Sequence, residues 1–181
     1  MKIQAKLVRA GNNEYLIRSA VDEDASELST LRLKLDGETE NFDREQGEGF
    51  LDEATFLQLI QSDTDAPNNL MIVAEMNGKL VGYARCEGST SKRLAHKVEF
   101  GVGVLQKYWG HGLGKNLLET CLVWAKSNRQ KKMSLQVLET NKPAIQLYEK
   151  YGFETEGILK KDKLLSVGNY YNTLILGAYF N

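Results

Sequence analysis

The sequence has little of what disordered, secreted or membrane-spanning proteins need. It contains only two prolines and two cysteines in 181 residues, and 42% of its residues are hydrophobic. Disordered proteins are poor in apolar residues, so that class is excluded. No apolar run approaches the roughly 20 residues of a membrane span, and residues 1–11 lack the apolar stretch of a signal peptide. These absences favour one cytoplasmic domain over residues 1–181, without a membrane partner.

An excess of charge of either sign is also missing. The 23 lysines and arginines almost balance the 24 acidic residues, which gives a formal net charge of −1. Nucleic-acid-binding domains are usually strongly basic, so we expect no nucleic-acid partner. Charge is nevertheless uneven, because residues 36–66 hold ten acidic and one basic residue, whereas residues 106–163 hold eleven basic and six acidic residues. Two solvated surfaces would explain this, and so would a cationic substrate beside an anionic cofactor.

The two cysteines give no sign of a metal site. Cys86 and Cys121 are far apart, lie in apolar segments and lack the spacing of metal ligands. We therefore expect two reduced cysteines in the core and no metal.

The hydrophobic pattern predicts alternating strands and helices in the central part of the chain. The expected helices begin at Asp22 or Asp24 as N-cap and at Thr55, and span 112–127 and 143–151. Expected strands are 2–8, 15–18, 70–76, 79–86, 97–104, 133–138, 154–159 and 170–178, with tight turns at Gly11-Asn12-Asn13 and Asn77-Gly78. This order predicts an α/β (mixed α+β) fold. Its central twisted sheet has about seven strands and helices on both faces, and residues 1–10 add an extra strand.

The most specific segment is Val104 to Lys115, where a strand gives way to a helix. Gly110, Gly112 and Gly114 alternate with other residues there. Glycine permits positive φ and a close approach of a ligand to the backbone. The first N–H groups of the helix lack internal partners, and with the helix dipole they form an anion site. Lys107 and Lys115 add positive charge.

Other uses of a glycine-rich turn fit less well. A Walker A loop needs glycine where Trp109 stands and Ser or Thr where Asn116 stands. A dinucleotide fold places its glycines in the first strand–helix unit, with an acidic residue about 20 positions later. A loop that serves helix packing alone stays open as an alternative.

Two segments of the chain together resemble the GNAT superfamily of N-acetyltransferases. The signature Arg/Gln-x-x-Gly-x-Gly/Ala is similar to residues 109–114, with Trp109 in place of Arg or Gln. Residues 135–153, which contain Asn141, Ala144, Leu147-Tyr148 and Gly152-Phe153, resemble the family's second CoA-side motif. The resemblance covers most of the chain from Tyr15 and is weakest between Gly37 and Asp65.

The resemblance implies that acyl-pantetheine lies in a gap between strand 97–104 and strand 133–138. Gly101 and Gly103 would remove side chains where the cofactor passes, or would mark a bulge. Tyr148 would protonate the departing thiolate as general acid, or would be a core tyrosine. Asn141 would bond pantetheine, cap the following helix, or do both. The implied cofactor-binding residues are Val102, Val104, Trp109, Gly110, His111, Gly112, Leu113, Gly114, Lys115 and Asn141.

The general base is less clear from the sequence. Glu99 is the candidate, directly or through water, and an ordinary strand carboxylate is its alternative. His96 and His111 are further alternatives. The ribosomal-protein-alanine branch of the family carries a glutamate where this chain has Gln136, so the base and substrate of that branch do not carry over.

The resemblance implies transfer of an acetyl group from acetyl-CoA to a primary amine through a ternary complex. The acidic segment favours a small cationic amine or a basic peptide N-terminus. Two other functions stay open: a non-catalytic acyl-CoA-binding regulatory module, and an interaction protein with an empty turn. The resemblance leaves the oligomeric state open, with a homodimer as one possibility.

Overall fold

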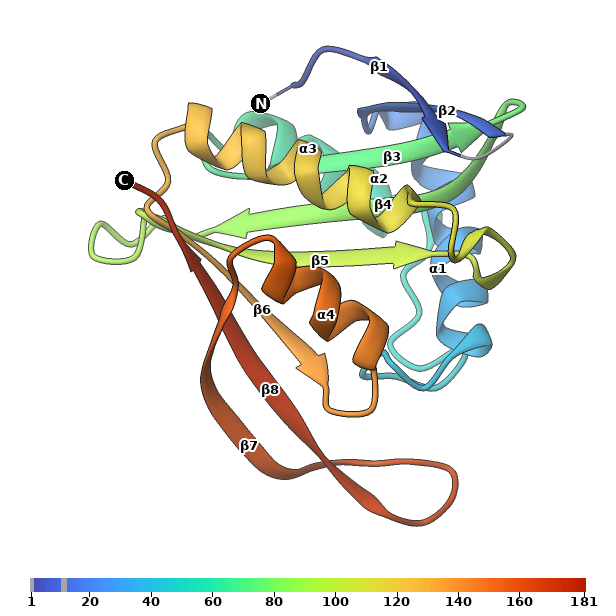
Figure 1. Ribbon diagram of the computed structural model, residues 1–181. Helices are drawn as coiled ribbons and strands as arrows, with labels where there is room; N and C mark the ends of the chain where they lie inside the picture. The colour runs from blue at the N-terminus through green and yellow to red at the C-terminus, as the bar shows by residue number, and fades with distance from the viewer. Residues whose placement is uncertain (1, 11–12) are drawn as a thin grey trace.

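The computed structural model describes residues 2–10 and 13–181, and the strands of this part form one eight-stranded sheet. The order in the sheet is β1-β2-β3-β4-β5-β6-β8-β7 (Figure 1). The strands are β1 (Lys6–Ala10), β2 (Asn13–Ser19), β3 (Leu70–Met76), β4 (Lys79–Gly88), β5 (Lys97–Val104), β6 (Lys132–Leu138), β7 (Glu154–Leu164) and β8 (Tyr170–Tyr179). Neighbouring strands are antiparallel except β5 and β6, which are parallel. The predicted mixed α/β fold is confirmed.

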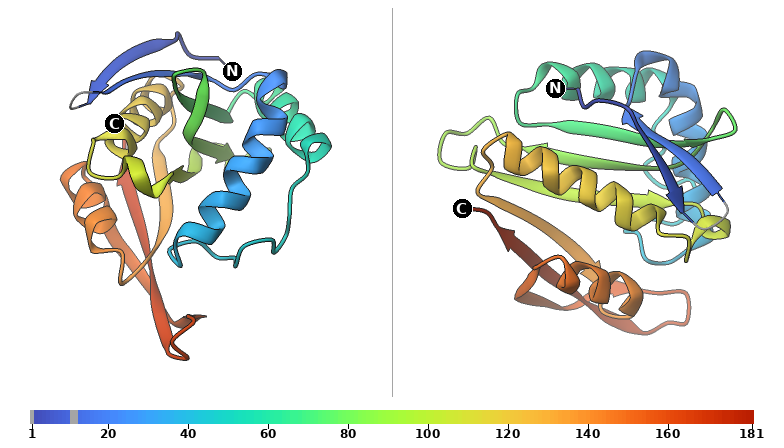
Figure 2. Two further views of the ribbon diagram at one scale, coloured as in Figure 1. Left: turned by 90° about the vertical axis from the view of Figure 1, so that its right-hand side faces the viewer. Right: turned by 45° about the horizontal axis from the view of Figure 1, so that its top comes forward.

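Helices cover both faces of the sheet, as Figure 1 and Figure 2 show. Helices α1 and α2 pack on one face, and α3 and α4 cover the other, so each face has its own apolar core. The helices are η1 (Asp22–Asp24), α1 (Ala25–Glu38), α2 (Glu53–Asp65), η2 (Gln106–Tyr108), α3 (Leu113–Ser127) and α4 (Lys142–Lys150). None of the helices in residues 2–10 and 13–181 is long and apolar enough to cross a membrane.

The two ends of the chain form the two edges of the sheet, where the sequence also predicts strands. The N-terminal strand β1 pairs with β2 of the same chain. Gly11 and Asn12 of the expected turn lie outside the described residues. Strands β7 and β8 form a long hairpin that reaches beyond α4 (Figure 1), and β7 runs five residues further than expected, to Leu164.

Local signals in the sequence explain most element boundaries. Asn77 and Gly78 have φ of 52° and 72°, as a tight turn between β3 and β4 requires. The carboxylate of Asp52 accepts the N–H of Thr55 at 2.8 Å and so caps α2. The helix therefore begins at Glu53, two residues earlier than predicted. Asp24 is the N-cap residue of α1, as predicted, but its side chain makes no capping bond to that helix. Its carboxylate instead binds Arg18 and accepts the Val21 N–H at 2.9 Å.

Both cysteines are free and buried in the core on the α3 side, as predicted. Burial and the neighbouring Cys121 thiol raise the pKa of Cys86 well above its usual value. Neither cysteine is therefore an available nucleophile.

Candidate functional site

An opening in the sheet lies between its two parallel strands. β5 and β6 pair only from Lys97 opposite Lys132 to Glu99 opposite Ser134, whereas β6 stays paired with β8 up to Leu138. Beyond Glu99, β5 keeps its pairing with β4 but has no partner on its β6 side. Backbone groups on that side must therefore bond a side chain, a ligand or water.

The register of β5 identifies which backbone groups face the opening. The Leu105 N–H donates to the Val81 carbonyl at 3.0 Å, so Leu105 faces β4. In a strand, successive residues direct their backbone groups to opposite sides. The pairing of β4 with β5 has no register shift, so Val102 and Val104 direct their N–H groups into the opening. These are the two residues whose amides the sequence resemblance assigns to pantetheine.

The glycine turn lies at the mouth of this opening, at the start of α3. Gly110 and Gly112 have φ of 76° and 79°, in the left-handed region that favours glycine. Gly112 is the N-cap residue of α3, and the N–H groups of the next three residues have no partner within the helix. A Cβ placed on Gly110 or Gly114 would meet no atom within 4 Å, so the space above the turn is open. The turn therefore fits a bulky anion such as a diphosphate.

Two side chains hold this turn to the rest of the protein. The indole Nε1 of Trp109 donates to the Val104 carbonyl at 2.7 Å, and the Glu38 carboxylate accepts the Gln106 N–H at 2.7 Å. Glu38 ends α1, so it links the helices on one face of the sheet to the turn that precedes α3. Sequence reasoning missed Glu38 because these two residues are 68 positions apart.

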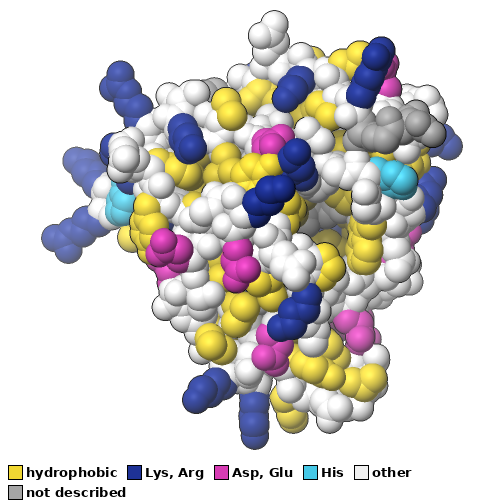
Figure 3. All heavy atoms as spheres, viewed as in Figure 1, with side chains coloured by type: hydrophobic (Ala, Val, Ile, Leu, Met, Phe, Trp, Pro, Cys, Tyr) yellow, Lys and Arg dark blue, Asp and Glu magenta, His cyan; other side chains and the backbone are white. Residues whose placement is uncertain are grey.

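The cationic side chains near the turn are exposed or only loosely held. Lys115 is 3.7 Å from Glu119, and Lys107 lies over the Tyr108 ring at 4.7 Å. His111 is exposed in the turn, and His96 is exposed in the loop before β5, at the end opposite the turn. On the face that carries α3 and α4, basic side chains are scattered among acidic and apolar ones (Figure 3).

Tyr148 is on α4 and packs against the core beside the opening. Its ring lies 6.4 Å from that of Phe100 and 5.6 Å from that of Phe153, both measured between centroids. Burial raises the pKa of Tyr148 to about 12, and its hydroxyl has no hydrogen-bond partner among the described residues. The hydroxyl thus stays protonated at neutral pH and is free to donate to a ligand.

Asn141 occupies the N-cap position of α4 but does not cap it through its side chain. Its backbone N–H donates to the Leu138 carbonyl, and its carbonyl accepts from Ile145. The capping role considered for its side chain is therefore wrong. The amide group remains available at the end of β6, where the resemblance places pantetheine.

Glu99 lies on the opposite face of the sheet from Tyr148. Val98 and Phe100 are in the core with α3, so the residue between them points toward the α1 side. Glu99 is exposed and lies across from Glu87 on β4. The structure thus separates the two predicted catalytic residues by the thickness of the sheet.

The two β5 glycines have different roles, one of which corrects the sequence interpretation. A Cβ on Gly103 would lie 2.7 Å from the Leu35 side chain, so this glycine makes room for α1 and not for a cofactor. A Cβ on Gly101 would meet nothing within 4 Å. Neither marks a bulge, because the pairing of β4 with β5 is regular.

Gln136, which stands where the ribosomal-protein-alanine branch carries its glutamate, also lies at the opening. It is exposed on β6, and continuing the β5–β6 register would place it opposite Gly101 across the opening. Both residues lie on the α1 face, because Leu135 and Val137 are buried on the other face.

An acidic pocket of about 760 Å³ lies between the α1–α2 loop and the tip of the β7–β8 hairpin. It adjoins the end of β5, because its residue Phe42 lies 3.4 Å from the Cβ position of Gly103. Lys163 and Arg44 are its basic residues, and each approaches an aspartate. The acidic lining residues are Asp36, Glu38, Glu40, Asp43, Glu45, Glu48 and Asp162. Most of the acidic segment noted in the sequence therefore faces one pocket.

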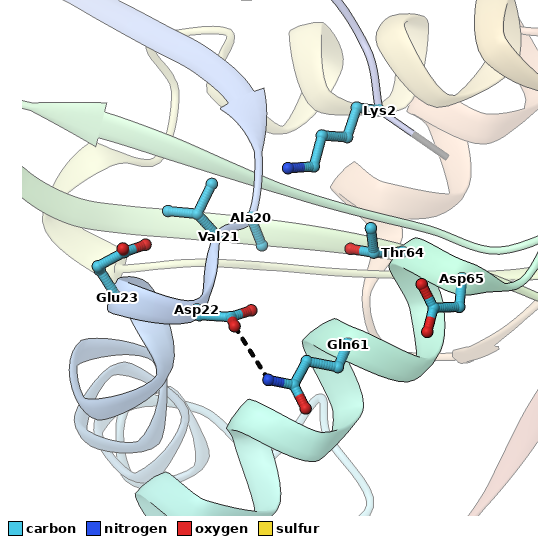
Figure 4. A pocket seen from close by; sticks show the side chains of 8 residues that line it. All are labelled: Lys2, Ala20, Val21, Asp22, Glu23, Gln61, Thr64 and Asp65. Atoms are coloured by element: carbon cyan, nitrogen blue, oxygen red, sulfur yellow. Dashed lines mark hydrogen bonds between the residues drawn. The ribbon is translucent and has the colours of Figure 1, made fainter.

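A second pocket, of about 440 Å³, lies away from the sheet opening, beside η1 and α2 (Figure 4). Asp22 and Gln61 are hydrogen-bonded to each other at 2.9 Å, and Lys2 lies above them. None of the predicted site residues lines this pocket.

The model of the Acetyltransferase (GNAT) family matches residues 35–153. The chain belongs to the GNAT family. Both motifs identified in the sequence lie in or at the edge of the matched region, and the opening and the glycine turn lie wholly within it.

Curated GNAT relatives match part of the chain. The L-amino acid N-acetyltransferase AaaT of Escherichia coli is 33% identical over 101 residues, which are 54% of this chain and 60% of that protein. The [Ribosomal protein bS18]-alanine N-acetyltransferase of Haemophilus influenzae is 29% identical over 57% of this chain and 67% of its own length. The chain spans about 60% of the length of the first of these relatives.

Solved GNAT structures match nearly the whole chain. An acetyltransferase of the GNAT family from Streptococcus pneumoniae has a TM-score of 0.88 and 26% identity, with 92% of this chain and 99% of that chain covered. YncA of Salmonella typhimurium, a putative acetyltransferase solved with acetyl-CoA, has a TM-score of 0.81 and 18% identity, with 97% and 95% covered. The second likeness bears on the fold alone.

Proposed function

We propose that this GNAT protein transfers an acetyl group from acetyl-CoA to a primary amine by direct attack in a ternary complex. The opening between β5 and β6, with the glycine turn at its mouth, is the observation that carries the proposal. The N–H groups at the start of α3 would form an anion site, and the unpaired edge of β5 would add backbone donors beside it. Family membership makes acetyl-CoA the donor that fits this site.

The two halves of acetyl-CoA would bind to different parts of this site. The N–H groups at the start of α3 would hold the diphosphate, and those of Val102 and Val104 would hold pantetheine. A backbone N–H beside the thioester would also stabilise the oxyanion that forms when the amine attacks. In enzymes, one such donor contributes about 2.7–4 kcal/mol to the barrier.

Tyr148 would act on the departing sulfur. Its pKa of about 12 is well above that of an ordinary thiol, near 8.5. Hydrogen-bond donation to the developing thiolate is therefore the role that this pKa favours: Tyr148 would keep its proton, and the CoA thiolate would leave as the carbon–sulfur bond breaks and take a proton from solvent.

Glu99 would act on the amine from the other face of the sheet. An amine must lose a proton to attack, and free amines are largely protonated at pH 7. Glu99 is exposed on the α1 side, the face opposite Tyr148. A water molecule between Glu99 and the amine would serve as a relay.

The acceptor would be a small cationic amine or a peptide N-terminus. The pocket beside the end of β5 has seven acidic and two basic lining residues. Cations would therefore be concentrated at this side of the opening. The named activities of AaaT and of the bS18-alanine enzyme, on amino acids and on a protein alanine, agree with an α-amine as the attacking group.

Direct attack is supported by the absence of an exposed thiol. The chain has two cysteines, and both are buried in the core. A covalent acetyl-cysteine intermediate would require one of them to leave its packed position.

The decisive experiment measures free thiol released from acetyl-CoA with a panel of amines. We expect release that depends on the amine, intersecting initial-rate lines, and higher kcat/KM for diamines and basic peptides than for neutral amines. Glu45→Gln should lower the ratio of kcat/KM for cationic amines to kcat/KM for neutral amines, because Glu45 lines the acidic pocket. Parallel lines would refute the ternary complex, and tight CoA binding without thiol release would refute catalysis.

A further inference from the structure

The Trp109 indole makes a contact that its place in the phosphate turn does not require. Its Nε1 reaches back five residues to the Val104 carbonyl, at 2.7 Å. The ring is 44% exposed, so burial of its apolar surface does not account for its position. Its backbone N–H is already used by the Gln106 carbonyl at 3.0 Å.

The carbonyl that the indole holds faces the opening in the sheet. The Leu105 N–H donates toward β4, and the Val104 carbonyl on the same peptide points the opposite way. No residue of β6 pairs with this part of β5. Trp109 therefore bonds the same edge of β5 that carries the free Val102 and Val104 N–H groups.

We propose that Trp109 is a positioning residue that fixes the distance and direction between the diphosphate turn and the pantetheine-binding edge of β5. Gly110 and Gly112 lie within three residues of Trp109, and both have positive φ, so the glycines give the turn little stiffness of its own. The indole bond fastens the start of this turn to the strand. This inference rests on the proposed function, because it assigns the two ends of the bond to two parts of one ligand.

A bond between two subsites has a distinct thermodynamic signature. A ligand that occupies both subsites gains from their fixed separation, because its second half binds as an intramolecular event. A ligand that occupies one subsite gains nothing from the same fastening. Loss of the bond should weaken the whole cofactor more than it weakens either half.

The bond also determines which groups remain for pantetheine. With its carbonyl bonded by Trp109, Val104 keeps its N–H as the unpaired group at the opening. A pantetheine amide beside the turn would then direct its carbonyl toward that N–H. Trp109 would thus favour one alignment of pantetheine along β5.

The test uses Trp109→Phe, which keeps an aromatic ring but removes the donor. We expect the Kd for CoA and the KM for acetyl-CoA to rise about three- to ten-fold, the effect of one net hydrogen bond. The kcat should stay within about two-fold, because the reacting atoms are untouched. The Kd values for adenosine 3′,5′-diphosphate and for pantetheine alone should change less than about two-fold.

Trp124→Phe is the matched control. Trp124 is the other tryptophan of the chain, and its buried Nε1 has no hydrogen-bond partner among the described residues. Its replacement removes the same N–H without breaking a bond, so cofactor binding should not change. Because the chain has two tryptophans, the spectrum of Trp124→Phe also identifies the NMR signal of the Trp109 indole N–H. In the wild-type protein, that signal should stay protected from solvent exchange when CoA is added.

Three results would overturn the inference. Equal weakening of adenosine 3′,5′-diphosphate and CoA would mean that Trp109 contacts the nucleotide directly. Unchanged CoA binding in Trp109→Phe would mean that the bond positions nothing. If the variant does not fold, the NMR measurement still decides, because an indole N–H that exchanges freely in the CoA complex would contradict the proposal. Absence of CoA binding by the wild-type protein would instead refute the proposed function.

Discussion

Tyr148→Phe separates the chemistry of the Tyr148 hydroxyl from the packing of its ring. The ring packs on Phe100 and Phe153, and phenylalanine would keep both contacts. The hydroxyl bonds no described residue, so its removal breaks no hydrogen bond in the free protein. We therefore expect no loss of thermal stability and no change in the Kd for CoA.

Turnover should nevertheless fall by at least about ten-fold, which corresponds to about 1.4 kcal/mol of barrier height. Acid–base groups typically contribute a factor of about 100 to 10,000. We expect the smaller, ten-fold effect because the raised pKa of Tyr148 favours hydrogen-bond donation over full proton transfer. The assay is the rate of thiol release at saturating acetyl-CoA and amine.

The pH dependence follows from the same hydroxyl. A pKa of about 12 means that Tyr148 remains protonated throughout the usual assay range. The rates of the wild-type protein and of Tyr148→Phe should therefore vary with pH in the same way between pH 8 and pH 10. A fall seen only in the wild-type protein is not expected. Such a fall would contradict the assignment.

Tyr151→Phe is the matched control on the same helix turn. The Tyr151 hydroxyl bonds the Glu119 carboxylate, and this bond raises its pKa to about 12 as well. Its removal should leave turnover unchanged and cost a little stability. An unchanged rate in Tyr148→Phe, or an equal loss in both variants, would refute the reasoning.

Three further predictions concern the turn, the base and the core. Gly112→Val should weaken CoA binding about ten-fold or more, because φ is 79° at this residue and a left-handed β-branched residue is strained by about 1–2 kcal/mol; a normal Kd by calorimetry would contradict the turn assignment. Glu99→Gln should lower kcat/KM for an amine about ten-fold or more at pH 7 and much less at pH 9.5, where free amine is abundant. An equal loss of kcat/KM at both pH values would show that Glu99 is not the base. Asp63→Asn should destabilise the fold by about 3–5 kcal/mol in urea, because the nearly buried Asp63 carboxylate binds Arg85 at 2.6 and 2.9 Å; a change under 1 kcal/mol would show that the pair adds little.

The sequence predicted those parts of the fold that depend on local signals. The Asn77-Gly78 turn, the bounds of β3 and β5, and the apolar stripe of α3 followed from periodicity and turn chemistry. The absence of a capping bond at α1 did not, because Arg18 competes for the Asp24 carboxylate through the fold. Such competition depends on tertiary contacts, which local rules do not include.

The site was predictable where it consists of backbone and less so where it consists of side chains. Glycine spacing indicated the turn before α3, because positive φ is a local property. Glu38 was missed because its place follows from the packing of α1. Gly103 was misread because its neighbour Leu35 is 68 positions earlier in the chain.

The backbone amide spectrum during a titration with CoA tests the central claim most directly. The account predicts saturable shifts that are largest for the N–H signals of Val102, Val104 and residues 110–115, with smaller changes elsewhere. Saturable shifts confined to other parts of the sheet, or no shifts at millimolar CoA, would contradict it.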